Sequence, residues 1–479
     1  MKGFIVAGTA SGVGKTTITA ALLAALRARG LTVQPFKCGP DYIDPAHHVA
    51  VAGRPSYNLD TWMMPVEINR SIFGNAIAQA DVAVVEGVMG LFDGASGSSD
   101  EGSTAEIAKL LGLPVVLVVD ASNAARSVAA IVRGFRDFDP QLRILGVILN
   151  GAAGPAHLRL LREAIAQIEV PVLGAFPRLP NASLAERHLG LVTAGEKTWS
   201  AEQVKALAEA AESNLDLDSL LDSASFELRA ASFEPREQQR SVGSRMPSDT
   251  AFSSAASRVQ ETCHAPVRIG IARDQAFSFY YRSSLDALRA AGAELIEVSP
   301  LADRDLPARL DGLYIGGGYP EVFAEELAQN QPFLSSLREF VAGGQPVYAE
   351  CGGLMYLAAE LTTRDARRHT MASVLPVAVE MLARLDGFGY TEVELVDDCL
   401  IGERGARLRG HSFHYSRVTH CGNLKRRYRT RQVLTGKENY EGYGFDNVLA
   451  SYIHLSFAAN PEAASHFVRH CREARAVAQ

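Results

Sequence analysis

A chain of 479 residues is too long for a single hydrophobic core, and its 47% hydrophobic and 21% charged residues are typical of a globular protein with two or three domains. The net charge of -7 and the pI near 6.0 do not provide the basic surface that nucleic-acid-binding proteins need, so we expect no nucleic-acid partner. The single basic run, residues 425–431, is interpreted as a solvated loop.

The first residues lack the apolar core of a signal peptide, and no later stretch reaches about 18 apolar residues. We therefore expect a cytoplasmic protein without membrane contact. The cysteines contain no CxxC pair, which argues against a disulfide framework and against a zinc site. They are Cys38, Cys263, Cys351, Cys399, Cys421 and Cys471.

Short apolar runs alternate with helical patterns in the first part of the chain. Residues 4–7, 82–85, 115–119 and 144–149 are almost entirely apolar, as in parallel strands that are buried on both faces. Residues 17–29 and 105–111 have helical spacing. We predict that residues 1–220 form a doubly wound α/β domain with a mostly parallel sheet.

The segment GTASGVGKTT, residues 8–17, has the pattern of a phosphate-binding loop between a strand and a helix. Its backbone N–H groups can surround phosphates, Lys15 can neutralise their charge, and Thr16 can hold a magnesium ion. We predict an ATP site there, formed by Gly12, Gly14, Lys15, Thr16 and Thr17. The loop is one residue longer than the standard GxxxxGK[ST] pattern, and this variant resembles the dethiobiotin synthetase and nitrogenase-iron-protein branch of P-loop proteins.

Two acidic clusters follow strands of this domain. The turn FKCGPDYIDP contains Asp41 and Asp44, and VVEGVMGLFDG contains Glu86 and Asp93. Ligands of open α/β sheets bind at the carboxyl ends of the strands, so both clusters should converge on the P-loop. Four carboxylates around a triphosphate require a divalent metal, and we predict that they bind magnesium and orient a substrate acid. For each acid alone, capping of a turn is the alternative.

Residues 221–266 are rich in serine, arginine, glutamate and proline and lack hydrophobic periodicity, which indicates a linker. A second α/β domain is predicted over residues 267–479, with strands near 268–272, 294–298, 312–315 and 347–349. In this domain PVYAECGGL places Cys351 at the apex of a glycine turn between a strand and a helix. That arrangement exposes a nucleophile near N–H groups that lower the pKa of a thiol; a buried structural cysteine is the alternative.

The remaining parts of a cysteine-dependent site follow from two other segments. YIGGGYPE supplies glycine N–H groups. We predict that Gly317 and Gly318, together with Gly352 from the turn at Cys351 (the nucleophile elbow), bind glutamine and stabilise the oxyanion. ASYIHLSF supplies His454 as the base, about a hundred residues after the cysteine. The predicted catalytic pair is Cys351 and His454.

The motifs GPDYIDP and VVEGVMGLFDG resemble those of the cobyrinate a,c-diamide synthase family, whose N-terminal domain is similar to dethiobiotin synthetase. The resemblance implies that ATP phosphorylates the a and c acetate groups of a corrin in cobalamin biosynthesis, and that ammonia from L-glutamine converts each to an amide. It places five residues around the activated carboxylate or its metal: Asp41, Tyr42, Asp44, Glu86 and Asp93. We assign the first three to the substrate and Glu86 and Asp93, together with Thr16 of the P-loop, to Mg²⁺. Asn150 is interpreted as a contact to the adenine of ATP.

The three glutaminase segments resemble the third type of glutamine amidotransferase domain, which has a class I-like α/β fold. Family members read HLHF where this chain has Ser456, which leaves open what orients the imidazole. They also read GHEFHYS where this chain has Ser412; for His411 and His414, substrate contact and a structural role are both open.

The order of motifs matches this family from the P-loop to His454. Hydrogenobyrinate and Ni-sirohydrochlorin present the same pair of acetates, so the tetrapyrrole and the order of amidation stay open. Cobyric acid synthase is a further alternative, although its N-terminal motifs resemble this chain less. A nucleotide-driven switch with a degenerate glutaminase domain is the non-enzymatic alternative, and the presence of both Cys351 and His454 argues against it. A homodimer is left open.

Overall fold

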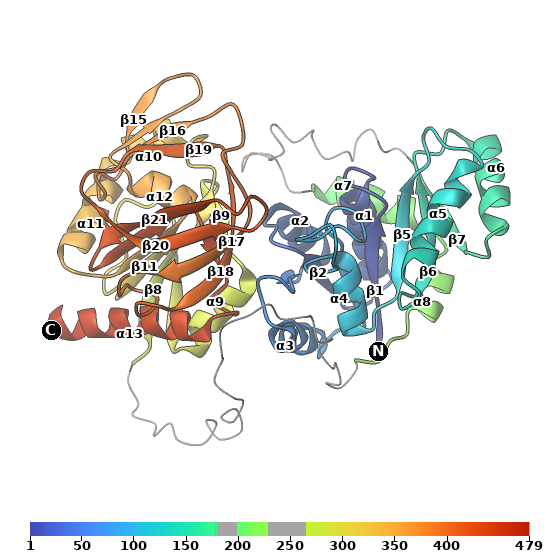
Figure 1. Ribbon diagram of the computed structural model, residues 1–479, viewed down its shortest axis with the longest axis horizontal. Coiled ribbons are helices and arrows are strands. Elements are labelled where there is room, and N and C mark those ends of the chain that lie inside the picture. The colour runs from blue at the N-terminus through green and yellow to red at the C-terminus, as the bar shows by residue number, and fades with distance from the viewer. Residues whose placement is uncertain (178, 180–198, 229–264, 479) are drawn as a thin grey trace, which may run out of the picture.

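The computed structural model describes residues 1–177, 179, 199–228 and 265–478, which form two α/β domains side by side (Figure 1). Cys263 and residues 229–264 of the expected linker lie outside the described residues. The linker start that we expected at residue 221 falls inside α8 (Leu217–Ser223). Phe226 is buried and packs edge-on against Phe73, so the first domain continues past this point. The surrounding serines had concealed these apolar residues in the sequence.

The N-terminal domain is built on a seven-stranded sheet in the order β3-β2-β4-β1-β5-β6-β7, in which all neighbours are parallel. Along β1, Phe4 and Val6 join the core shared with α1 and α7, and Ile5 and Ala7 join the core on the opposite face. Helices cover both faces, which explains the continuous apolar strands and confirms the doubly wound prediction. The strands are β1 (Lys2–Gly8), β2 (Val33–Cys38), β3 (Tyr57–Leu59), β4 (Val82–Glu86), β5 (Val115–Asp120), β6 (Ile144–Asn150) and β7 (Val172–Phe176). The other helices are α1 (Lys15–Ala28), α2 (Ile43–Ala52), α3 (Val66–Ile77), α4 (Thr104–Leu111), α5 (Ser127–Phe138), α6 (Pro155–Ala166) and α7 (Ala201–Asn214).

The C-terminal domain is built on a ten-stranded mixed sheet in the order β10-β8-β11-β13-β22-β21-β20-β17-β18-β23. The first five strands are parallel and the rest are antiparallel, and smaller sheets are formed by β12-β9 and β15-β14-β16-β19. The helices are α9 (Arg282–Ala290), α10 (Ala324–Gln329), α11 (Gln331–Ala342), α12 (Gly352–Leu357) and α13 (Pro461–Ala478). The strands are β8 (Val267–Ala272), β9 (Phe277–Phe279), β10 (Ala293–Val298), β11 (Gly312–Ile315), β12 (Gly317–Gly318), β13 (Val347–Glu350), β14 (Glu360–Thr362), β15 (Arg368–Thr370), β16 (Ala378–Met381), β17 (Gly387–Leu395), β18 (Arg407–His414), β19 (Ser416–His420), β20 (Lys425–Gln432), β21 (Glu438–Phe445), β22 (Val448–Ser451) and β23 (His454–Leu455).

The interpretation of the basic run as a loop was wrong, because these residues form β20. Arg427 is buried and its guanidinium contacts Asp397 at 2.6 Å, and Arg429 contacts Glu394 on the neighbouring strand at 2.6 Å. Carboxylates around this strand therefore balance the charges that made the segment look like a solvated loop. No helix of the described residues is long and apolar enough to cross a membrane.

A buried aromatic contact joins the two domains. Trp62, which follows β3, stacks on Tyr390 of β17 with ring centroids 4.4 Å apart. The Tyr390 hydroxyl donates to Asp60 Oδ2 at 2.8 Å, and Arg409 of β18 donates to the Trp62 carbonyl at 2.8 Å. These contacts hold the carboxyl ends of the first sheet against the second domain, where the predicted site residues lie.

Candidate active site

The P-loop connects β1 to α1. Gly12 and Gly14 have φ of 79° and 96°, in the left-handed region that favours glycine. The Lys15 Nζ donates to the Ala10 carbonyl at 3.0 Å, and its side chain is 8% exposed. Burial, together with the nearby positive charge of Lys37, lowers the pKa of Lys15 to about 8. At neutral pH Lys15 is still mostly protonated, and an anion bound in the loop would raise its pKa again.

Asn150 and Thr17 lie beside the same loop. The Asn150 Nδ2 donates to the Val13 carbonyl at 2.9 Å, and Thr17 lines the cavity described below. Asn150 ends β6, which lies between β5 and the edge strand β7 in the sheet. In this structure the Asn150 amide supports the loop itself, and its contact to adenine stays a prediction.

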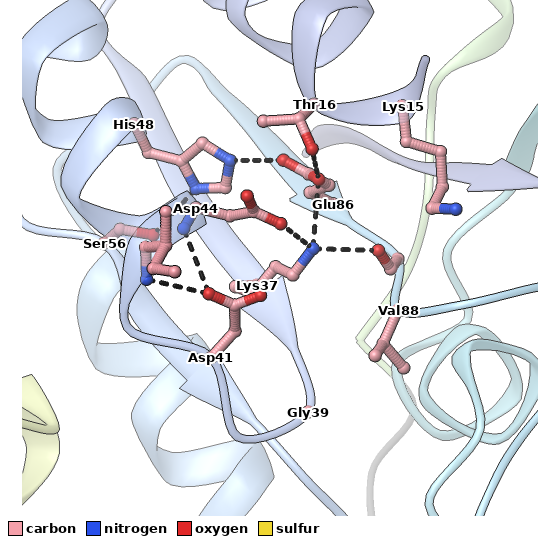
Figure 2. A network of polar contacts seen from close by, with 12 residues as sticks. Lys15, Thr16, Lys37, Gly39, Asp41, Asp44, His48, Ser56, Glu86 and Val88 are labelled. Carbon is pink, nitrogen blue, oxygen red and sulfur yellow. Dashed lines mark hydrogen bonds and ion pairs between the residues drawn. The ribbon is translucent and has the colours of Figure 1, made fainter. Parts of the chain in front are cut away.

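Lys37, near the end of β2, is the centre of a buried polar network (Figure 2). Its Nζ donates to Asp44 Oδ2 at 2.5 Å, to Glu86 Oε1 at 3.0 Å and to the Gly87 carbonyl at 3.1 Å. Burial alone would lower the pKa of Lys37, but the carboxylates of Asp44 and Glu86 raise it above its ordinary value. The two carboxylates therefore keep Lys37 protonated. One strand, β4, lies between β2 and β1, which leads into the P-loop. Lys37 stands in the motif FKCGPDYIDP, but we did not predict it as a site residue.

Glu86, at the end of β4, joins the network to the P-loop helix. Thr16 Oγ1 donates to Glu86 Oε1 at 2.8 Å, and His48 Nε2 lies 2.7 Å from Glu86 Oε2. The other ring nitrogen of His48 contacts Ser56 at 3.0 Å. The Thr16 hydroxyl and the Glu86 carboxylate are adjacent hard oxygen ligands of the type that Mg²⁺ prefers, so these two residues would hold the ion when it binds with ATP. We did not predict His48 as a site residue, because no motif surrounds it in the sequence.

The other two predicted acids cap turns in this structure. Asp41 Oδ1 accepts hydrogen bonds from the backbone N–H groups of Ile43 and Asp44, which fixes the start of α2 while Asp41 still lines the cavity. Asp93 is exposed, and its Oδ2 accepts from the Gly90 N–H at 2.8 Å. Its role as a metal ligand stays a prediction.

Cys351 lies at a sharp turn between β13 and α12. Its φ is 49°, in a region that is unusual for a residue other than glycine and costs on the order of 1–3 kcal/mol. A Cβ added to Gly352 would lie 3.0 Å from the Gly318 nitrogen and 2.9 Å from Pro320. The two predicted oxyanion segments therefore touch directly, and only glycine permits this approach.

His454 begins β23, is 2% exposed and packs against the backbone of Gly317. Its Nδ1 lies 3.4 Å from Glu350 Oε2. Burial alone would lower the pKa of His454, but Cys351 and the Glu350 carboxylate raise it to about 10. The imidazole thus lies between the predicted nucleophile and a buried carboxylate.

Glu350 is a residue that the sequence analysis missed. Its carboxylate is buried and accepts hydrogen bonds from Tyr314 at 2.8 Å, from Tyr348 at 2.7 Å and from the Leu455 N–H at 3.0 Å. Three donors fix it beside His454, and it immediately precedes the cysteine in the sequence. The position of an acidic residue directly before the predicted nucleophile was the feature of the sequence that could have indicated this role.

Ser456 and the two histidines near Ser412 have different surroundings. Ser456 Oγ accepts from the Ala459 N–H at 3.3 Å and caps the following turn. His414 Nδ1 lies 2.7 Å from the Ser416 carbonyl, and its ring stacks on Tyr452 at 3.8 Å, which gives it a structural role. His411 differs, because it lines the cavity between the domains.

One cavity of about 660 Å³ connects the two sets of residues. It is lined by the P-loop, by Asp41, Tyr42, Asp44 and Glu86 of the first domain, and by His454 of the second. The Tyr42 ring lies 5.0 Å from the His454 ring and stacks on Phe279 at 5.1 Å between centroids. A residue of the predicted substrate turn therefore contacts the predicted base of the glutaminase.

This combination defines a class of enzyme, in which a P-loop domain and a cysteine amidotransferase domain share one chamber. Residues 4–192 match the family of CobQ/CobB/MinD/ParA nucleotide binding domains, and residues 268–462 match the CobB/CobQ-like glutamine amidotransferase domain. The protein is thus an ATP-dependent glutamine amidotransferase, a glutamine-hydrolysing ligase with the two-domain α/β fold that we predicted.

Relatives over the full length identify the family. The chain is 43% identical to a cobyrinate a,c-diamide synthase of Syntrophotalea carbinolica, and the match covers 98% of both chains. It is 41% identical to that of Dehalococcoides mccartyi over 97% of both chains, and 40% identical to that of Salmonella typhimurium over 98% of both. The chain belongs to the cobyrinate a,c-diamide synthase family.

Proposed function

We propose that this protein amidates the a and c acetate groups of cobyrinate in cobalamin biosynthesis, with ATP and L-glutamine as co-substrates. The single observation that supports this most is the cavity that contains both the P-loop and His454. One ligand there can reach the nucleotide and the source of ammonia together. Both walls come from one chain, so the proposal does not require the homodimer that we left open.

In the first half-reaction, an acetate oxygen of the substrate attacks the terminal phosphorus of ATP, ADP leaves, and an acyl phosphate forms. Gly12, Gly14, Lys15 and Thr17 bind the phosphates through N–H groups and charge, with Asn150 near the base. Thr16 and Glu86 would hold Mg²⁺, and Asp93 is a further candidate ligand. The ion would neutralise negative charge on the phosphates. Lys37 is the protonated group near the acetate, and Asp41, Tyr42 and Asp44 position the substrate.

In the second half-reaction, the Cys351 thiolate attacks the amide carbon of glutamine. The N–H groups around Gly317, Gly318 and Gly352 stabilise the oxyanion, and His454 donates a proton to the departing ammonia. Water then attacks the thioester, His454 takes a proton from this water, and glutamate leaves. Ammonia attacks the carbonyl carbon of the acyl phosphate, the C–O bond to phosphate breaks, and the departing phosphate takes the proton that the nitrogen loses as the amide forms.

The choice of tetrapyrrole is tested by turnover. Purified protein is incubated with ATP, magnesium and glutamine and with cobyrinate, hydrogenobyrinate or Ni-sirohydrochlorin, and products are counted by mass spectrometry. We expect cobyrinate to gain two amides with the highest kcat/KM. A preference for another acid would assign the chain to that substrate, amidation at four other positions would indicate cobyric acid synthase, and ATP hydrolysis without any amide would support a switch.

We further propose that Glu350 positions His454, in the role that Ser456 leaves open. Glu350→Gln should lower glutamine hydrolysis by roughly a hundredfold and leave ammonium-dependent amidation unchanged. Glu350 raises the pKa of His454, so its charge preserves the imidazolium to higher pH. In the variant the alkaline limb of the hydrolysis rate should therefore move to lower pH.

Ser456→His is the matched comparison, because Ser456 caps the turn that follows β23 and His454 begins that strand. We expect no increase in its rate of glutamine hydrolysis. An increase with Ser456→His, or an unmoved pH profile with Glu350→Gln, would show that another residue orients the imidazole.

A further inference from the structure

The two walls of the cavity differ in chemistry. The first domain contributes the charged side of Lys15, Lys37 and the acidic residues. The second domain contributes a mostly apolar side made of Phe388, Tyr390, Phe413, Val433 and Leu434, which we call the aromatic wall. A ligand that fills this space must be apolar on one side and anionic on the other.

The aromatic wall contains unusually exposed apolar side chains. Phe388 is 46% exposed and Leu434 is 73% exposed. Large apolar side chains that gather in a concave site usually mark a binding surface. Two hydrogen bonds attach the segment that carries Val433 and Leu434 to β17. The Val433 N–H donates to the Tyr390 carbonyl at 3.0 Å, and Gln432 Nε2 donates to the Phe388 carbonyl at 2.5 Å.

His411 supplies an independent sign of a ligand. It lies on β18 beside the wall, is 8% exposed, and lines the cavity. Its Nδ1 has no hydrogen-bond partner among the residues that the structure describes. Burial, together with the nearby His454, lowers the pKa of His411 to about 3, so the ring is neutral. A buried polar nitrogen without a partner costs free energy unless a ligand satisfies it.

We propose that the aromatic wall binds the ring body of a tetrapyrrole polycarboxylic acid, with His411 as a hydrogen-bonding partner for one of its peripheral groups. The inference rests on the proposed function and assigns the position of its substrate. The ring lies against Phe388 and Leu434, and one acetate arm extends across the cavity toward Lys37. The glutaminase domain then has a second task, because it forms half of the substrate site of the synthetase.

The test separates substrate binding from ammonia supply. In the double variant Phe388→Ala, Leu434→Ala, ammonium chloride replaces glutamine, and KM is measured for cobyrinate and for ATP. Loss of two apolar contacts should raise the KM for cobyrinate by roughly ten- to a hundredfold without a change in the KM for ATP. A titration of the protein with cobyrinate, followed by absorbance without ATP, should show the same weakening.

Tyr440→Ala is the matched control, because Tyr440 is an aromatic residue of the same domain that is 57% exposed and does not line the cavity. It should leave both constants unchanged, and thermal unfolding should show that all variants fold. If the wild type amidates cobyrinate and the double variant binds it with unchanged affinity, the proposed role of the aromatic wall is refuted but the proposed function is not. Reduced self-association in sedimentation with unchanged affinity would also refute it and indicate an interface between copies. A wild type that does not amidate cobyrinate would instead refute the proposed function.

Discussion

Cys351→Ala should reduce glutamine-dependent amidation by at least about a thousandfold and leave amidation with ammonium intact. The Cys351 sulfur is the atom that attacks the amide carbon of glutamine in the proposed mechanism, so its removal prevents the release of ammonia. The acyl phosphate is made at the other end of the cavity, so it still forms and still reacts with ammonia from solution. The measurement compares product formation with glutamine at neutral pH and with excess ammonium chloride at alkaline pH.

Cys421→Ala is a suitable control, since Cys421 is a free, partly buried cysteine of the same domain that does not line the cavity. It should retain both activities. Residual use of glutamine by Cys351→Ala would rule out the nucleophile, and failure of ammonium to rescue a folded variant would contradict the division of tasks between the domains.

Lys15→Ala should have the opposite pattern, with amidation reduced by roughly a thousandfold for glutamine and ammonium alike. Lys15 supplies the positive charge with which the P-loop binds the phosphates of ATP. Both nitrogen donors need the acyl phosphate made from ATP, so neither can compensate for the loss of Lys15. Asp44→Asn should behave in the same way, because it removes a carboxylate that fixes the buried Lys37. Initial rates with each nitrogen donor at saturating ATP provide the comparison.

Lys205→Ala tests whether any loss of positive charge in this domain has such an effect, since Lys205 on α7 has a side chain that is 78% exposed and lies outside the cavity. It should retain full activity. If Lys15→Ala lost only its use of glutamine, Lys15 would belong to the ammonia-producing half, and the assignment of the P-loop would be wrong.

The parts of the site that could be predicted from sequence are those encoded by local patterns. The P-loop requires left-handed glycines before a helix, and the elbow requires glycines after a strand, so Gly14 and Cys351 were recognisable without a structure. The parallel strands were equally clear, because burial on both faces leaves continuous apolar runs such as β5. The rule that ligands bind at carboxyl ends of strands correctly brought Asp44 and Glu86 together.

The rest depends on contacts between distant segments. Glu350 contacts His454 only because β13 and β23 meet in the folded domain, and His48 reaches Glu86 from another helix. The basic run was misread because the carboxylates that balance it come from neighbouring segments of the sheet. The aromatic wall could not be recognised either, because its apolar residues come from β17, β18 and the turn after β20 and form one surface only in the folded second domain.

In the proposed mechanism, ammonia passes from Cys351 to the acyl phosphate inside one chain. The most direct measurement supplies cobyrinate, ATP, magnesium and glutamine with a labelled amide nitrogen, in the presence of an excess of unlabelled ammonium chloride at neutral pH. Mass spectrometry then determines the label in both amides of the product. We predict that both amides carry the label with little dilution, because His454, the neighbour of Cys351, lines the same cavity as the P-loop. Label diluted to the composition of the bulk solution would contradict internal transfer.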